Sequence, residues 1–259
     1  VIVNMMRGGP GLGTIQPSQS DYFQATKGGG HGDYRLIVYG PASVQELVDL
    51  TMLAFEVADR YRNPVMILGD GVMGQMMEPV RFPQDYRPEP PEKTWATTGT
   101  AFHGGGPNLI SSLYLEAEDL YRHNERLQAK YRQIAAAETR YETVQVEDAE
   151  AVIVAYGMMA RVALQAVRRL RAEGHKVGLV RPITLWPFPH AILEELAPQV
   201  RLFLVTEMSY GQLLEDVRLA VNGQAPVYFH GKAGGVIPEV REIVDQLTGL
   251  LQKEVASHD

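Results

Sequence analysis

The residues best suited to chemistry stand at the start of the chain, where a cation meets a glycine-rich turn. Residues 1–6 are apolar except for Asn4, which is typical of a short buried strand. Arg7 follows, and four glycines and a proline then occupy residues 8–13. Glycine permits close approach to the backbone, exposed N–H groups form anion-binding concavities, and a guanidinium binds a carboxylate through two parallel hydrogen bonds. The pattern therefore predicts an anion site after a strand, where α/β sheets bind ligands.

A structural interpretation of the same residues stays open. A Gly-Pro-Gly loop after a strand commonly serves only as a turn, and an arginine beside it is commonly solvated. Two nucleotide-binding motifs are excluded, because the glycines fall at positions 9, 11 and 13 and no Gly-Lys-Ser/Thr follows. The loop is therefore either a turn or a site for another kind of anion.

Further polar candidates lie in loops downstream. His31 and Asp33 stand in Gly-His-Gly-Asp, where they are expected to make either polar cofactor contacts or structural hydrogen bonds. Asp70, between two glycines, is interpreted as a turn residue at a strand end, because no convincing asparagine completes a metal motif. His103 begins no His-x-x-x-His spacing, and Glu207 is expected to cap the following helix or to lie at a subunit interface. We therefore predict no metal site, and we assign no catalytic acid or base to this chain.

Three segments together resemble one known family. They are Arg-Gly-Gly-Pro at 7–10, Gln-Ser-Asp-Tyr-Phe-Gln-Ala at 19–25 and Gly-His-Gly-Asp-Tyr at 30–34. These motifs look like the alpha subunit of the 2-oxoacid:ferredoxin oxidoreductases, with the 2-ketoisovalerate type the most similar. The resemblance covers most of the chain and is weakest over 79–142. It implies an oxidoreductase subunit for the CoA-dependent oxidative decarboxylation of a 2-oxoacid, branched-chain favoured, to an acyl-CoA, with electrons passed to ferredoxin.

The resemblance also implies roles for individual residues. Arg7 matches the family's arginine that binds the 2-oxoacid carboxylate beside the thiamine. Leu12 departs from the family pattern Arg-Gly-Gly-Pro-Ser-Thr-Gly, which has a threonine at this position. An apolar side chain there favours a branched or aromatic substrate, unless Leu12 packs into the core instead. The cofactor-binding residues that the resemblance implies are Gly8, Gly9, Pro10, Gly11, His31 and Asp33.

Cofactors and partners follow from the same resemblance. Thiamine diphosphate and Mg²⁺ are expected in a site shared with a beta subunit, and CoA is expected as co-substrate. Iron–sulfur clusters are expected on partner subunits only, since these 259 residues contain no cysteine to ligate one. The implied partners are beta, gamma and delta-type subunits and ferredoxin. The family's Gly-Asn-Glu-Ala stretch, whose glutamate holds the thiamine aminopyrimidine, is absent, so we expect that the N-terminal part of the first domain is missing.

The composition of the chain bears on its partners and its cellular location. The formal net charge is −7, the pI is near 5.5 and no basic run occurs, which argues against nucleic acid as a partner. No apolar stretch approaches the roughly 20 residues of a membrane-spanning helix, and no signal peptide is recognisable. The lack of cysteine favours a cytoplasmic location.

Alternating strand and helix patterns indicate an α/β fold. Residues 1–78 are interpreted as the C-terminal part of a thiamine pyrimidine-binding-type domain, 79–145 as a linker and bridging helix, and 146–259 as a doubly wound parallel-sheet domain resembling the transketolase C-terminal domain. The expected strands are 1–6, 36–39, 64–68, 151–156, 177–180, 202–206 and 227–229. The expected helices are 18–25, 44–61, 108–141, 160–172, 190–196, 212–221 and 238–251.

Two functions from different classes stay open at this point. The first is the oxidoreductase subunit described above. The alternative is a non-catalytic structural or assembly subunit, or a fragment, with the same fold. A self-contained thiamine enzyme is disfavoured, because no complete Gly-Asp-Gly…Asn metal motif is present.

Overall fold

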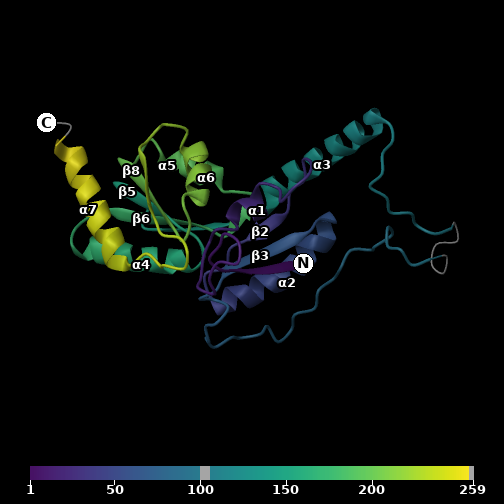
Figure 1. Cartoon of the computed structure of the whole chain (residues 1–259), viewed down its shortest axis with the longest axis horizontal. Helices are drawn as coiled ribbons and strands as arrows, with labels where there is room; N and C mark the ends of the chain where they lie inside the picture. The colour runs from purple at the N-terminus through teal and green to yellow at the C-terminus, as the bar shows by residue number, and fades with distance from the viewer. Residues whose placement is uncertain (100–105, 257–259) are drawn as a thin grey trace.

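The computed structural model describes residues 1–99 and 106–256, and it contains two β-sheets whose carboxyl edges meet (Figure 1). The first sheet has the strand order β1 (Ile2–Met6), β3 (Val65–Asp70), β2 (Ile37–Tyr39) and β7 (Thr184–Trp186). The second has the order β4 (Tyr141–Val144), β6 (Val177–Pro182), β5 (Ala151–Val154), β8 (Leu202–Glu207) and β9 (Val227–Gly231). The expected α/β fold is confirmed.

In the first sheet β1, β3 and β2 run parallel, and β7 pairs antiparallel with β2. The predicted burial of residues 1–6 is wrong for the first half of β1, because Ile2 and Val3 are 43% and 54% exposed. Their apolar composition suggested burial, but burial needs neighbours, and β1 pairs with β3 alone. Met6, at the carboxyl end of the strand, is fully buried.

Helices cover both faces of the first sheet. α2 (Val44–Tyr61) begins after the N-cap residue Ser43, whose hydroxyl accepts a hydrogen bond from the Glu46 backbone N–H at 3.1 Å. α2 and the long α3 (Ala117–Glu138) pack their apolar side chains against β2 and β3. The short α1 (Tyr22–Thr26) contributes Tyr22 to the cluster on the other face.

The bridging helix is shorter than predicted. Helix formers suggested residues 108–141, but α3 begins at Ala117, and residues 106–116 carry neither helix nor strand. Leu109 and Leu115 in this segment are about 90% and 86% exposed, so no packing supports a helix there. At the other end, residues 141–144 form the strand β4, which was not predicted. Tyr141, Thr143 and Val144 favour a strand, and the segment pairs with β6.

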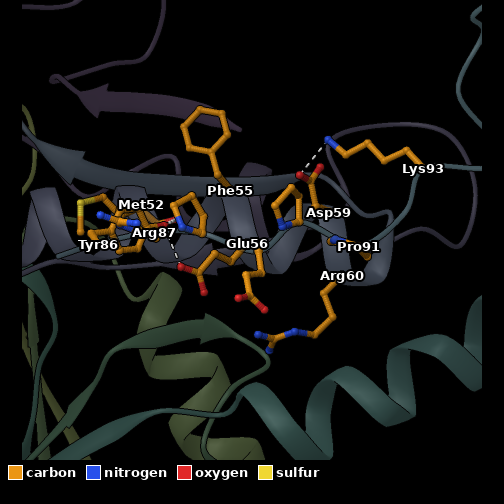
Figure 2. Close-up of a pocket in the computed structure, with 12 residues that line it drawn as sticks. Met52, Phe55, Glu56, Asp59, Arg60, Tyr86, Arg87, Pro91 and Lys93 are labelled. Carbon is orange, nitrogen blue, oxygen red and sulfur yellow. Dashed lines mark hydrogen bonds and ion pairs between the residues drawn. The ribbon is translucent and has the colours of Figure 1, made fainter.

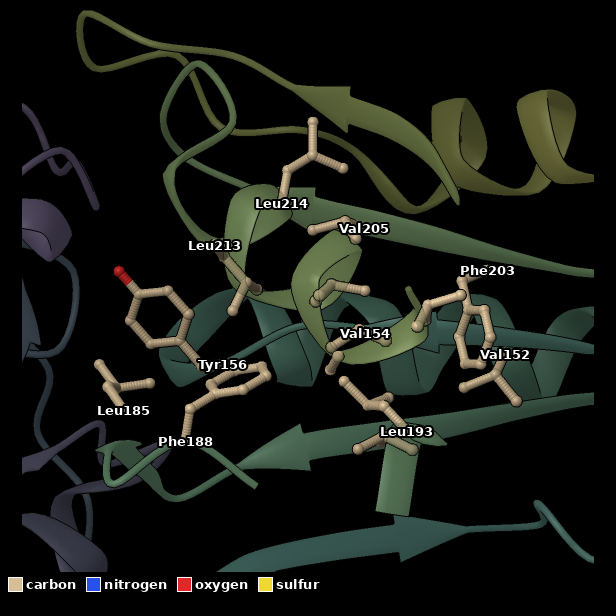
Figure 3. Close-up of a cluster of buried hydrophobic side chains, with 14 of the residues drawn as sticks. Val152, Val154, Tyr156, Leu185, Phe188, Leu193, Phe203, Val205, Leu213 and Leu214 are labelled. Carbon is tan, nitrogen blue, oxygen red and sulfur yellow. The ribbon is translucent and has the colours of Figure 1, made fainter. Parts of the chain in front are cut away.

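The second sheet confirms the doubly wound prediction for β6, β5, β8 and β9, which are all parallel, and adds β4 as an antiparallel edge. Alternate residues of a strand point to opposite faces. Val152 and Val154 pack toward α5 (His190–Leu196) and α6 (Gln212–Val221), as Figure 3 shows. Ile153 packs toward α4 (Gly157–Ala172) and α7 (Val240–Ala256) on the other face.

The two sheets share one hydrophobic core. Tyr22 and Leu68, from the first half of the chain, belong to the same buried cluster as Val154 and Val205. The rings of Tyr22 and Tyr156 lie 5.7 Å apart between centroids. β7 belongs to the second half by sequence but to the first sheet by pairing. The two halves of the chain therefore pack against each other through this shared core. The domain boundaries expected at residues 78 and 145 stay predictions.

An ion-pair cluster also joins the halves. The guanidinium of Arg181, on β6, donates to both carboxylate oxygens of Glu46 on α2, at 2.9 and 2.7 Å. Its Nε–H donates to Glu142 on β4 at 2.8 Å. Within the described residues, no helix has both the length and the apolarity needed to cross a bilayer.

Candidate functional site

Residues 8–16 form a closed loop directly after β1. The Gly8 N–H donates to the Gln16 carbonyl at 2.8 Å, and the Thr14 N–H donates to the Gly8 carbonyl at 2.8 Å. Gly13 has a φ of 54°, and a Cβ placed on it would lie 1.9 Å from the Gly8 oxygen. Only glycine is therefore compatible with this position. We call residues 7–16 the Arg7 loop.

The loop fixes the orientation of the Arg7 guanidinium. Nη1 donates to the carbonyls of Leu12 and Thr14, the latter at 3.2 Å. Arg7 is exposed and forms no ion pair in the described part of the chain, where Nε–H and the second amino group also lack a protein acceptor. These two groups form the fork that takes both oxygens of a carboxylate. The cation is thus held by neutral carbonyls and remains available to an anion.

Two apolar side chains of the Arg7 loop are exposed. Leu12 is 90% exposed and Ile15 is 78% exposed, so the alternative in which Leu12 packs into the core does not hold in this chain. A cavity of about 360 Å³ adjoins the loop. Its lining residues are Ile15, Gln16, Pro17, Gly71, Val72, Gln75, Met76 and Ile237. The Arg7 loop thus carries exposed apolar side chains together with a cation that forms no ion pair among the described residues.

Gln19, which sequence reasoning did not single out, ties the end of the Arg7 loop to the second sheet. Its backbone N–H donates to the Met208 carbonyl at 2.9 Å, and its side-chain oxygen accepts from the Met208 N–H at 2.9 Å. Its side-chain amide donates to the Tyr156 carbonyl at 3.0 Å, and Gln19 is fully buried. The carboxyl ends of β5 and β8 are thereby connected to the segment that follows Arg7.

Asp70, at the carboxyl end of β3, is confirmed as a strand-end turn residue. One carboxylate oxygen accepts from the N–H groups of Val72 and Met73 at 3.0 and 3.1 Å. The other oxygen lies 3.4 Å from the Met158 N–H in the first turn of α4, where the helix dipole favours negative charge. Burial nevertheless raises the pKa of Asp70 above its ordinary value. This carboxylate connects the two sheets.

Glu207, at the end of β8, is confirmed as a helix cap. Its carboxylate accepts from the N–H groups of Leu213 and Leu214 in α6, at 3.1 and 3.3 Å, and from the Ser209 hydroxyl. The residue is fully buried, and this burial raises the pKa of Glu207 above its ordinary value. The cap explains its position without a catalytic role.

The raised pKa of Glu207 predicts a pH effect on stability. The Glu207 carboxyl keeps its proton to higher pH in the folded state than in the unfolded state. The free energy of unfolding therefore falls as the pH rises from 4.5, the ordinary pKa, through the pKa of the folded state. Glu207→Gln cannot ionise. The unfolding free energy of this variant minus that of the wild type should therefore become more positive as the pH rises through that interval, measured by urea denaturation. The exposed Glu195→Gln is the control, and an equal trend in both variants would contradict the prediction.

The structure places His31 and Asp33 apart from Arg7. Both are exposed in the loop that precedes β2, at the amino end of the first sheet, whereas Arg7 follows the carboxyl end of β1. The Asp33 carbonyl accepts from the Gln128 side chain on α3 at 3.1 Å. This chain does not bring the two residues into the Arg7 loop, and their contact with a cofactor stays a prediction. His103 lies outside the described residues.

Another cavity, of about 530 Å³, lies between α2 and residues 86–93 (Figure 2). Lys93 closes one side of it through an ion pair with Asp59 at 2.8 Å. None of the predicted site residues lines this cavity. In the described ranges, His, Cys, Asp and Glu side chains form no group of three or more that could hold a metal ion.

Comparisons with known proteins agree with the motifs. Residues 1–151 match the family profile "Pyruvate flavodoxin/ferredoxin oxidoreductase, thiamine diP-bdg", and residues 149–243 match "Pyruvate:ferredoxin oxidoreductase core domain II". Ketoisovalerate oxidoreductase subunit VorB of Methanothermobacter thermautotrophicus is 49% identical over 95% of this chain and 69% of that protein. 2-Oxoglutarate synthase subunit KorA of Methanothermobacter marburgensis is 32% identical over 96% of this chain and 73% of that protein.

A solved structure also matches. It is 2-oxoglutarate:ferredoxin oxidoreductase from Magnetococcus marinus with 2-oxoglutarate, coenzyme A and succinyl-CoA bound, with a TM-score of 0.83 and 25% identity. The match covers 95% of this chain, which spans about half, 48%, of that chain. The predicted resemblance is confirmed by the profile, sequence and structure matches together. The chain belongs to the 2-oxoacid:ferredoxin oxidoreductase family.

Proposed function

We propose that this chain is the alpha-type subunit of an enzyme that oxidatively decarboxylates a 2-oxoacid to an acyl-CoA and passes the electrons to ferredoxin. In this proposal Arg7 binds the substrate carboxylate. The observation that carries it is the exposed guanidinium, oriented by two loop carbonyls and without an ion pair in the described residues. A 2-oxoacid keeps its carboxylate until CO₂ leaves, so a fixed cation orients the bond that breaks.

Leu12 and Ile15 favour a branched-chain substrate in this proposal. Their exposed apolar side chains belong to the same loop as the cation, and we propose that they contact the side chain of a bound 2-oxoacid. The 49% identity to a ketoisovalerate oxidoreductase subunit supports the same class. The family's threonine at the position of Leu12 would instead offer a hydroxyl to the substrate.

Leu12→Thr tests this specificity. We expect kcat/KM for 2-oxoisovalerate, relative to that for 2-oxoglutarate, to fall by about tenfold, the typical effect of losing a small amount of apolar contact. The measurement is the ratio of the two kcat/KM values in the assembled enzyme. Leu219→Thr, an exposed leucine on α6, serves as the control. A ratio that is equal in the wild type and Leu12→Thr would refute the role of Leu12.

The described residues fit one wall of a thiamine diphosphate site. The backbone N–H groups of Gly9 and Gly11 make no hydrogen bond within the described residues, so they are available to polar edges of a cofactor beside Gly8 and Pro10. When bound, thiamine diphosphate supplies the electron sink for decarboxylation. We place its diphosphate and Mg²⁺ on a beta subunit. His31 and Asp33, which lie apart from the Arg7 loop in this chain, stay proposed as polar cofactor contacts.

The partners in this proposal are beta, gamma and delta-type subunits, which carry the iron–sulfur clusters, and ferredoxin. CoA is the co-substrate that accepts the acyl group. The names of the relatives support this assembly, because VorB and KorA are both described as subunits. The lack of cysteine supports the cytoplasm, where thiols and clusters are kept reduced.

The proposal is tested with the purified complex that contains this chain. We expect it to reduce ferredoxin only when both a 2-oxoacid and CoA are present, which is followed by the absorbance of ferredoxin. A complex that assembles around this chain but gives no 2-oxoacid-dependent reduction would favour the non-catalytic assembly subunit instead.

A further inference from the structure

A second glycine loop, residues 232–237, lies against the Arg7 loop. It follows β9 and leads into α7. A Cβ on Gly8 would lie 3.1 Å from the carbonyl carbon of Gly234 and 3.2 Å from the Gly235 nitrogen. A Cβ on Gly235, which has a φ of 98°, would lie 2.3 Å from Cβ of Gln16. The two loops therefore touch backbone to backbone, and neither tolerates a side chain at the contact.

The second loop is held firmly at both ends. The Lys232 backbone N–H donates to the Glu207 carbonyl at 3.3 Å, and its ammonium group lies 2.6 Å from the Glu242 carboxylate. The second oxygen of Glu242 accepts from the Glu239 N–H at 2.8 Å. Glu207 is itself fixed as the cap of α6. This loop is thus anchored to β8 and to the start of α7, and it presents a fixed surface.

The contact falls on the residues that orient Arg7. Gly235 faces Gln16 and also Thr14. A Cβ added to Gly235 would lie 3.2 Å from Cγ2 of Thr14. The Thr14 carbonyl accepts a hydrogen bond from Arg7, and the Gln16 carbonyl closes the loop through Gly8. A displacement of Thr14 therefore moves one of the two carbonyls that hold the guanidinium, and a displacement of Gln16 disturbs the hydrogen bond that closes the loop.

We propose that Gly235 is a positioning residue for Arg7, and that the loop of residues 232–237 sets the substrate-binding geometry from the other half of the chain. The expected effect of Gly235 on substrate binding rests on the proposed function. The expected effect of Gly235 on the Arg7 loop rests on the contact between the two loops alone. It extends the site beyond the motifs of the first 34 residues to a glycine pair more than 200 residues away.

Gly235→Ala and Gly234→Ala form a matched pair for the test. Both glycines have a positive φ, 98° and 69°, so both variants carry backbone strain, but nothing lies within 4 Å of a Cβ on Gly234. In the assembled enzyme we expect amide hydrogen exchange over residues 7–16 to rise by about tenfold in Gly235→Ala only, because loosened hydrogen bonds open locally. KM for the 2-oxoacid should rise by roughly tenfold, with a smaller change in kcat.

A second-site change makes the test specific to the contact. Gln16→Gly removes the Cβ that the new methyl group meets, whereas Gln16→Ala keeps it. We therefore expect Gln16→Gly to restore slow exchange and low KM in Gly235→Ala, and Gln16→Ala to restore neither. Gln16→Gly alone gives the baseline. If Gly235→Ala acted by destabilising the fold in general, Gln16→Gly and Gln16→Ala would have the same effect on it.

The outcomes separate this inference from the proposed function. Equal exchange over residues 7–16 in Gly235→Ala and Gly234→Ala, or equal rescue by both Gln16 variants, would overturn the positioning role of Gly235. Faster exchange with an unchanged KM would support the contact and contradict the substrate role of Arg7 instead.

Discussion

Replacing Arg7 by alanine is expected to raise KM for the 2-oxoacid by roughly a hundredfold, because two charge-assisted hydrogen bonds to the carboxylate are lost. The fold should be retained, since Arg7 is exposed and forms no ion pair in the described residues. Arg7→Lys keeps the charge but lacks the planar fork, so its KM should rise by about tenfold. Steady-state kinetics of the assembled enzyme, with ferredoxin reduction as the signal, gives both values.

The control for this prediction is Arg241→Ala, an exposed arginine of α7 whose side chain is 80% exposed. Its KM should equal that of the wild type. If Arg7→Ala kept the wild-type kcat/KM, the loop would be a structural turn, as the alternative interpretation of the sequence holds. A loss of activity with an altered subunit composition would show an assembly defect, so the composition of each purified complex is verified by mass spectrometry.

The largest effect on stability is expected for Gln19→Ala. The change leaves the buried Met208 N–H without a partner, and it opens a cavity. It also removes one of the two hydrogen bonds that the Tyr156 carbonyl accepts, since the Ala160 N–H still donates to it at 3.2 Å. An unsatisfied buried group costs about 1–3 kcal/mol, and the lost hydrogen bond and the cavity add to this cost, so the free energy of unfolding should fall by about 3 kcal/mol. Urea denaturation followed by circular dichroism measures the change.

The exposed Gln84→Ala is the matched control, and its unfolding free energy should lie within about 0.5 kcal/mol of the wild type. Gln19→Glu is a sharper test. The carboxylate oxygen that replaces the amide nitrogen would face the Tyr156 carbonyl, and two acceptors repel one another. A wild-type unfolding midpoint in both Gln19 variants would show that the packing of the two sheets does not depend on this side chain.

The sequence predicted the local features of the site well. Arg7, its glycines and the preceding strand are neighbours in the chain, so their composition was enough to place a cation in a closed loop after a strand. The turn role of Asp70 and the cap role of Glu207 were also predictable, because their partners lie only a few residues away.

Features built by distant contacts were not predictable. Gln19 and Met208 are separated by 189 residues, and no local pattern pairs them. The same holds for β7, whose three residues pair with β2 in the first sheet. The exposed half of β1 and the shortened α3 show the converse error, in which apolar or helix-forming composition was taken as a sign of packing that the chain does not provide.

His31 and Asp33 show how chain order can mislead about space. They lie fewer than thirty residues after Arg7 and share its glycine-rich context, which suggested one site. Because the strands are parallel, the residues before β2 lie at the amino ends of the strands and the residues after β1 lie at the carboxyl ends. Within one chain the two segments are therefore separate, although their sequence motifs occur together.

The central claim is that Arg7 binds the substrate carboxylate, and inhibitor affinity tests it most directly. The competitive inhibition constants of 2-hydroxy-3-methylbutanoate and of its uncharged amide are compared in wild type and Arg7→Ala. Wild type should bind the carboxylate roughly a hundredfold more tightly than the amide, and Arg7→Ala should bind the two about equally. An equal preference for the carboxylate in both proteins would show that another group binds it, and the account of this site would be wrong.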